Sequence, residues 1–241
     1  MSWTAKRFYK TAEVAAAPGG FSVTLDGRPV KTPVGSPLVL PTTDLAAAVA
    51  EEWLAQQETI KPQSMPITQL AATTLDRVGP QRAAMIDLAL SYASTDLVCY
   101  RADSPADLIE RQEADWQPLL DWLSATCGAR LEVTSGIIPL EQPVEALDKL
   151  RIVITGFTDV ELTALITGMQ ALGSLVIALA LMLERVDADR AFALSQLDES
   201  YQIERWGDDE EAAERRQSLR EEVRLAAVFL ELARSSDKET T

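Results

Sequence analysis

The chain has 241 residues, of which 47% are hydrophobic, and its formal net charge is −15. This apolar content is enough for a packed core and excludes a largely disordered protein, while the negative charge disfavours binding to nucleic-acid phosphates. The chain contains no histidine, which excludes Ser-His-Asp and Cys-His catalysis as well as histidine-ligated zinc.

The first 40 residues have the pattern of a small antiparallel sheet. Residues 21–25 alternate apolar and polar side chains, and Asp26-Gly27 follows, a dipeptide typical of a two-residue hairpin turn. Pro29 cannot donate a backbone hydrogen bond, so we expect the return strand to be short or at a sheet edge. Residues 38–40 form a further short apolar strand after a second turn.

A helix is predicted next, over residues 43–57, with Thr42 or Thr43 as its cap. A proline-rich connector follows, and we place a domain boundary there: a β-rich N-terminal domain with one helix over residues 1–64 and an α-helical domain over 65–235. The polar residues 236–241 are expected to form a disordered tail. The fold class is therefore α+β.

The second domain is expected to be helical almost throughout. The expected helices cover residues 67–78, 80–94, 105–126, 143–155, 159–184, 187–206 and 209–234. Pro80 is expected at the first position of its helix. Residues 131–140 are either a short strand or an extended link.

Residues 162–183 contain no charged side chain and are long enough to be a membrane-span candidate. The run contains polar residues such as Thr163 and Gln170, lacks Trp and Tyr at its ends, and is flanked by acidic residues. We therefore favour a central helix buried on nearly all sides, without membrane insertion.

Few residues offer catalytic chemistry. The sequence has no phosphate-binding glycine motif, and Cys99 and Cys127 are interpreted as core thiols in a reducing compartment. Paired carboxylates remain as candidates for acid–base or metal chemistry, which makes a carboxylate-dependent hydrolase or metal enzyme an alternative function. These pairs are Glu51/Glu52, Asp187/Asp189, Asp198/Glu199 and the cluster 208–211. Such acids are usually solvated or placed at helix starts, so we expect no metal and no cofactor.

The segment 197–212, LDESYQIERWGDDEEA, contains the most distinctive group of residues. Gly207 is expected to end a helix in the left-handed conformation. Asp208 and Asp209 then fit the acidic start of the next helix, so Gly207 and Asp208 are interpreted as a structural junction.

The acids Asp198 and Glu199 are expected to lie in the middle of a helix, where the helix dipole does not explain them. With Gln202 and Trp206 they form a candidate partner-binding stripe at helical spacing. The other interpretation is that Tyr201 and Trp206 pack into the core while the acids face water.

The chain resembles the assembly chaperone that binds the alpha subunit of the F-type ATP synthase head. Four segments, in order, carry the resemblance: LDGRPVKTP (25–33), AVAEEW (48–53), YASTDLVCYRA (92–102) and LDESYQIERWG (197–207). The similarity runs over nearly the whole chain.

The resemblance implies a non-enzymatic chaperone without a cofactor. It would hold the free alpha subunit at its beta-facing surface and prevent its aggregation until beta replaces it. The resemblance also implies an essential acid in the LDE segment, which is Asp198 or Glu199 here. We expect a monomer in a bacterial cytoplasm, or in the mitochondrial matrix if this is a processed chain. A generic acidic adaptor for another basic protein is a further alternative.

Overall fold

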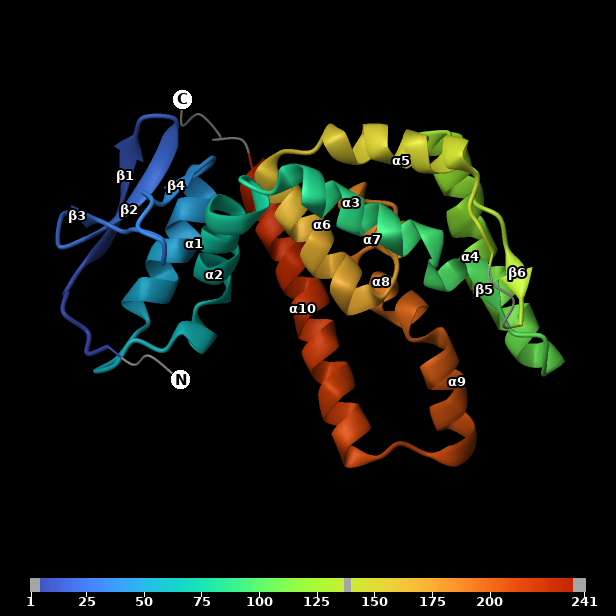
Figure 1. Cartoon of the computed structure of the whole chain (residues 1–241). Coiled ribbons are helices and arrows are strands. Elements are labelled where there is room, and N and C mark those ends of the chain that lie inside the picture. The colour runs from blue at the N-terminus through green and yellow to red at the C-terminus, as the bar shows by residue number, and fades with distance from the viewer. Residues whose placement is uncertain (1–4, 137–139, 236–241) are drawn as a thin grey trace, which may run out of the picture. The chain divides into compact units, whose positions relative to one another are not determined.

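The computed structural model describes residues 5–136 and 140–235. Contacts divide the chain into two compact units (Figure 1). The first contains residues up to 82 together with 159–163 and those from 228 on, and the second contains 83–158 and 164–227. The first unit thus extends beyond residue 64. The domain boundary expected after residue 64 stays a prediction. The expected tail lies outside the described residues.

A small antiparallel sheet forms the first part of unit 1. Strand β1 (Ala12–Ala17) pairs with β2 (Gly20–Leu25), which also pairs with the short strands β3 (Arg28–Pro29) and β4 (Val39–Leu40). The turn between β2 and β3 is the predicted Asp26-Gly27, and both residues have positive φ (48° and 77°). β3 has only two residues, as Pro29 predicts.

Two helices pack beside the sheet. Helix α1 (Thr43–Leu54) begins after Thr42, whose hydroxyl accepts a hydrogen bond from Leu45 N at 3.2 Å. Helix α2 (Pro66–Thr73) continues as the π-helical turn η2 (Thr74–Val78). Glu52 of α1 caps α2, because its two carboxylate oxygens accept hydrogen bonds from Ile67 N and Thr68 N, each at 2.7 Å. This cap fixes α2 against α1.

Unit 2 is built mainly of helices. They are α3 (Arg82–Ser94), α4 (Ala106–Cys127), α5 (Val144–Thr155), α6 (Asp159–Leu172), α7 (Leu175–Met182), α8 (Ala188–Ser195), α9 (Leu197–Trp206) and α10 (Glu210–Arg234). The first residue of α3, the start of α6 and the end of α10 belong to unit 1. The 3₁₀ turn η3 (Leu97–Cys99) leads into β5 (Tyr100–Arg101), which pairs in parallel with β6 (Thr134–Ser135). Part of the expected strand 131–140 lies outside the described residues.

The core of unit 2 is centred on α7, in which every residue is buried. The charge-free run 162–183 is mostly buried, with Gln170 and Gly173 exposed, but it is two helices rather than one. Gly173 has φ +67°, and Ser174 caps α7 by accepting a hydrogen bond from Ile177 N at 3.0 Å. Among the described residues no helix is long and apolar enough to cross a membrane.

The buried carboxylate of Asp96 explains why the helix divides there. It accepts hydrogen bonds from the Ser174 hydroxyl at 2.6 Å, from Val176 N at 3.0 Å and from Val98 N at 3.2 Å. Asp96 therefore satisfies donors at the starts of α7 and η3 that have no partner within their own helices. Ser174 and Val176 lie 78 and 80 residues away along the chain, beyond the reach of local sequence patterns.

Two other helix boundaries differ from expectation. Helix α3 begins at Arg82, after a turn that contains Pro80, rather than at Pro80. The expected helix 187–206 is divided into α8 and α9 at Gln196. The remaining predicted helices agree with the structure to within a few residues at their ends.

Candidate functional site

The two acids of the candidate stripe lie at a helix start. Gln196 has φ −104° and ψ 20°, so α8 ends before it and α9 begins at Leu197. Asp198 and Glu199 therefore occupy the first turn of α9, and the expectation that they lie mid-helix was wrong. The helix dipole stabilises acids at this position. Glutamine is a good helix former, so Gln196 gave no sign in the sequence that the helix is interrupted there.

Asp198 faces inward, toward α4. Its Oδ1 accepts a hydrogen bond from Gln112 Nε2 at 2.7 Å, and the Gln112 side chain is almost fully buried. The carbonyl of Gln112 in turn accepts from Arg101 Nη1 at 2.6 Å. Burial lowers the pKa of Arg101, while the negative charges of Glu113 and Asp198 oppose that effect. Asp198 thus belongs to a polar network that joins α4, β5 and α9.

Tyr201 and Arg205 continue this inner face. The buried Tyr201 donates its hydroxyl to Asp107 Oδ1 at 2.8 Å, and Arg205 forms an ion pair with the same carboxylate. The Arg205 guanidinium lies 4.2 Å from the centre of the Tyr201 ring. The hydrogen bond from Tyr201, with the charge of Arg205, holds the pKa of Asp107 below its usual value. These contacts fix the orientation of α9 against α4.

The outer face of α9 consists of Glu199, Gln202 and Trp206, which are spaced at i, i+3 and i+7 and are all exposed. The Trp206 side chain is 76% exposed, so the interpretation that it packs into the core was wrong for Trp206 and correct for Tyr201. Within the described residues, none of the three has a polar side-chain partner. The predicted single stripe is therefore divided, with Asp198 inside and the other three outside.

The junction after α9 differs in detail from the prediction. Gly207 ends the helix with φ 86° and ψ 168°, an extended positive-φ conformation rather than the left-handed helical one. The cap of α10 is Asp209, whose Oδ1 accepts from Ala212 N at 2.9 Å. Asp208 instead forms an ion pair with Arg216 at 3.4 Å. Of the two acids expected at this helix start, Asp209 is therefore the cap, and Asp208 lies before it in the junction.

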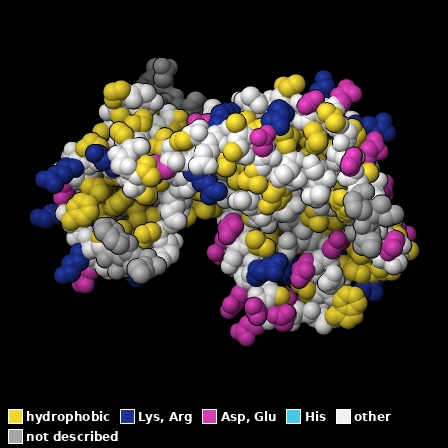
Figure 2. All heavy atoms as spheres, viewed as in Figure 1, with side chains coloured by type: hydrophobic (Ala, Val, Ile, Leu, Met, Phe, Trp, Pro, Cys, Tyr) yellow, Lys and Arg dark blue, Asp and Glu magenta, His cyan; other side chains and the backbone are white. Residues whose placement is uncertain are grey.

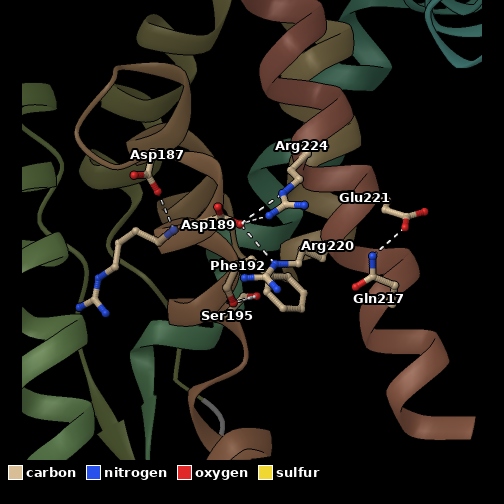
Figure 3. Close-up of polar contacts among 9 residues, drawn as sticks. Asp187, Asp189, Phe192, Ser195, Gln217, Arg220, Glu221 and Arg224 are labelled. Atoms are coloured by element: carbon tan, nitrogen blue, oxygen red, sulfur yellow. Dashed lines mark hydrogen bonds and ion pairs between the residues drawn. The ribbon is translucent and has the colours of Figure 1, made fainter. Parts of the chain in front are cut away.

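Each of the other carboxylate groups contains at least one acid with a structural partner. Asp187 caps α8 by accepting from Arg190 N at 2.7 Å, and Asp189 accepts from Arg224 Nη2 at 2.7 Å and from Arg220 Nε at 3.2 Å (Figure 3). Figure 3 shows these arginines of α10 pointing toward Asp189 on α8. Glu52 caps α2, as described above. In the part of the chain that the structure describes, no group of three or more His, Cys, Asp or Glu side chains could hold a metal ion.

Sequence reasoning missed Gln112, Asp107 and Arg101 as supports of this surface. A signal was present for Gln112, because it lies four residues before the buried Trp116, on the buried side of α4. A polar side chain at such a position needs a hydrogen-bond partner. The partner itself could not be inferred, since it lies 86 residues away.

Comparisons with known proteins give consistent results. A family model described as ATP12 chaperone protein matches residues 6–124. A relative named "Protein atp12, mitochondrial", from Schizosaccharomyces pombe, is 25% identical over 221 residues, which cover 87% of this chain and 76% of that protein. The crystal structure of Atp12 from Paracoccus denitrificans is 42% identical, with a TM-score of 0.92, and the match covers 95% of this chain and 99% of that chain. An aspartate-to-lysine mutant of P. denitrificans Atp12p is 41% identical, with the same TM-score and coverage of 95% and 98%.

Proposed function

The chain belongs to the ATP12 chaperone protein family, a family of ATP synthase assembly chaperones, and from this membership we propose that it binds the free alpha subunit. It holds alpha at the surface that beta later covers, prevents its aggregation, and yields when beta arrives. Membership confirms the resemblance found in the sequence and implies a protein client in the synthase head. The choice of alpha, the non-enzymatic action and a bacterial cytoplasmic location belong to the proposal.

The outer face of α9 is the proposed contact with the client. The observation that carries this assignment is the 76% exposed Trp206 beside the exposed carboxylate of Glu199 on one face of the helix. Trp is the residue type most enriched among the energetic centres of protein interfaces. The inner face of α9 is fixed by α4, so these side chains are presented on a rigid support.

The charges of this surface indicate a basic client patch. The chain carries a net charge of −15, which steers a basic partner surface toward it. In the proposed complex Glu199 pairs with a cation of alpha, and Trp206 fills an apolar depression beside it. Asp198 positions α9 through Gln112 and is not itself the contact. A small anchored interface gives modest affinity, which allows beta to displace the chaperone.

The test is co-expression of the alpha subunit with and without this protein, followed by measurement of soluble alpha. We expect soluble alpha in the presence of the wild-type protein and aggregated alpha both without it and with the Glu199→Lys variant. Glu145→Lys is the matched control, because Glu145 is an exposed acid in the first turn of α5. Both substitutions therefore carry the same helix-dipole cost.

No effect of the wild-type protein on alpha solubility would contradict the proposed function. Equal loss with Glu145→Lys would instead show a general charge effect and remove α9 as the site. A pull-down from the native lysate separates alpha from any other basic client and thereby tests the adaptor alternative.

A further inference from the structure

The two edges of the sheet in unit 1 are protected to different degrees. At one edge, β3 and β4 have two residues each, and β3 ends in Pro29, which has no N–H. At the other edge, β1 has six residues, contains no Pro or Lys, and pairs with β2 one to one without a bulge (Figure 1). Short strands, prolines, lysines and bulges are the usual devices that keep a sheet edge from pairing with another chain. Among the residues that the structure describes, no further strand pairs with β1, so this edge is open.

The main chain of β1 presents unpaired groups along this edge. Val30 N donates to Val23 O at 2.8 Å, so Val23 of β2 directs its backbone toward β3 and away from β1. Val23 lies opposite Val14 in the register. In an antiparallel pair, residues that do not bond to each other direct their N–H and C=O groups to the opposite edges. Val14, and with it Ala16, therefore point two N–H and two C=O groups outward, without a partner among the described residues.

These groups can be reached from solvent. Val14 is 39% exposed and Ala16 is also exposed, whereas the next outward residue, Ala12, is only 6% exposed. The available edge therefore centres on Val14 and Ala16, whose outward groups are spaced about 7 Å apart, as in any strand. A second extended chain matches this alternation of donors and acceptors, so the ligand that fits is a β-strand.

The side chain of Val14 defines one face of that added strand. Val14 is paired with Val23, which is fully buried, and opposed side chains lie on the same face of a sheet. Helix α1 packs on β1 and β2, so the apolar surface beneath α1 continues to Val14 at the edge. Apolar residues of the added strand opposite Val14 and Ala16 would extend this surface.

Glu13 defines the other face. It is exposed and forms no ion pair within the described residues. A basic residue directly opposite Glu13 would form a favourable cross-strand pair. The surrounding charge is otherwise balanced, because residues 5–82 contain eight Lys or Arg and seven Asp or Glu. Figure 2 shows acidic side chains gathered instead around the junction of α9 and α10. Recognition at this edge therefore depends on the main chain and on Glu13.

A second copy of this chain fits the edge less well. When two β1 strands pair through their outward groups, Glu13 of one copy lies opposite Ala15, Ala17 or the other Glu13. None of these is a cation, and two acids directly opposite each other are destabilising. The net charge of −15 on each copy also opposes self-association. A strand from another protein that carries a basic residue is the better complement.

We propose that the β1 edge binds an extended segment of the client polypeptide as an added antiparallel strand. This inference rests on the proposed chaperone function and adds a second contact to it. The segment alternates apolar residues, which lie opposite Val14 and Ala16, with polar residues, one of which is a cation opposite Glu13. A client chain with an unpaired strand edge of its own is prone to aggregate, and pairing with β1 covers that edge.

The test measures fluorescence anisotropy with the full-length protein and a fluorescein-labelled peptide, Ser-Val-Thr-Val-Lys-Val-Thr, with an amidated end. We expect saturable binding. Methylation of the valine nitrogens removes the N–H groups that point toward β1 and should weaken binding at least about fivefold. Methylation of the nitrogens of the two threonines and the lysine is the matched control. Those groups point away from β1, so binding should weaken much less.

Variants of β1 locate the binding. Val14→Pro removes an outward N–H and should weaken peptide binding at least about fivefold. Proline is tolerated at an edge position whose N–H faces solvent, so the sheet should still form. Val144→Pro is the matched control, because Val144 is 74% exposed and is the first residue of α5, where proline is also tolerated. Ala16→Pro is the second blocking variant should Val14→Pro fail to fold.

A charge exchange tests the register. Glu13→Lys should weaken binding of the lysine peptide by about two- to threefold. A peptide with Glu in place of its Lys should show the reverse preference and bind Glu13→Lys better than the wild-type protein. This reversal would not follow if the peptide bound elsewhere on the chain.

The proposal is overturned if the wild-type protein does not bind the peptide, or if folded Val14→Pro and Ala16→Pro bind it undiminished. Equal loss from methylation on either side of the peptide shows binding without strand pairing, which also overturns it. So does a concentration-dependent dimer of the wild-type protein that Val14→Pro abolishes in sedimentation, because a second copy then occupies the edge. Glu199→Lys should bind the peptide normally. If the wild-type protein binds the peptide but never solubilises alpha, the proposed function fails while β1 remains a strand-binding edge.

Discussion

Gln112 Nε2 of α4 donates a hydrogen bond to Asp198 Oδ1 of α9 at 2.7 Å, while the adjacent acid, Glu199, points outward without a polar partner among the described residues. Two neighbouring carboxylates at one helix start therefore have different tasks. Asp198 holds the helix in place, and Glu199 is the acid that we propose contacts the client.

This difference predicts opposite results for the two charge reversals. Asp198→Lys should lower the free energy of unfolding by about 1–3 kcal/mol, because it removes an acceptor from the buried Gln112 and adds a cation near Arg101. Glu199→Lys should change it by no more than about 0.5 kcal/mol. Urea unfolding followed by circular dichroism measures both values. Asp198→Asn keeps an acceptor and should lie between them, and equal stability of the two reversals would contradict the assignment.

Trp206→Ala should weaken binding of the alpha subunit without affecting stability. A largely exposed apolar side chain contributes little to folding, whereas truncation of a tryptophan at an interface centre costs about 2 kcal/mol or more of binding free energy, or roughly 30-fold in Kd. Isothermal titration with purified alpha measures the loss. Val144→Ala is the control, since Val144 on α5 is 74% exposed. Unchanged affinity of the Trp206 variant would exclude the outer face of α9 as the contact.

Asp96 should make the protein less stable as the pH rises from 4 to 6. Burial raises the pKa of Asp96 to about 6, against the hydrogen bonds from Ser174, Val176 and Val98. Between the unfolded and folded pKa values the native state binds a proton that the unfolded state does not, so the stabilisation is complete below about pH 4 and is lost as the pH rises through 6. The change contributed by this residue is about 3 kcal/mol.

Denaturant unfolding of wild type and Asp96→Asn at several pH values tests this effect. Carboxylates whose pKa is lowered act in the opposite direction. Asp26 is one of them, because backbone hydrogen bonds from Thr11 and Lys10 hold its pKa down. The relevant quantity is therefore the difference between the two proteins, which should change between pH 4 and 6 and stay constant above. A constant difference over the whole range would contradict the buried-acid assignment.

Glu52→Ala should destabilise unit 1 by about 1–2 kcal/mol, because two backbone N–H groups at the start of α2 lose their acceptor. Glu51→Ala is the matched control, since Glu51 is the exposed neighbour on the same helix. Thermal unfolding compares the two. Equal melting temperatures for the two variants would show that the cap contributes nothing.

The sequence by itself determined the features that depend on neighbouring residues. The alternation in 21–25 and the Asp26-Gly27 turn predicted the hairpin, and the charge-free run 162–183 predicted the buried centre of the helical part. Four short motifs predicted the family, which the relatives confirm. Each of these signals is set by local backbone preference or by hydrophobic periodicity, which a single segment contains in full.

Only the tertiary structure decided how Asp198 and Glu199 differ. Both occupy the same acidic pair in the sequence, and Gln112, which distinguishes them, is supplied by another helix. The same holds for Asp96, whose contact with Ser174 divides the expected helix 159–184. Hydrogen bonds between distant segments depend on how the elements pack, and local periodicity carries no information about such partners.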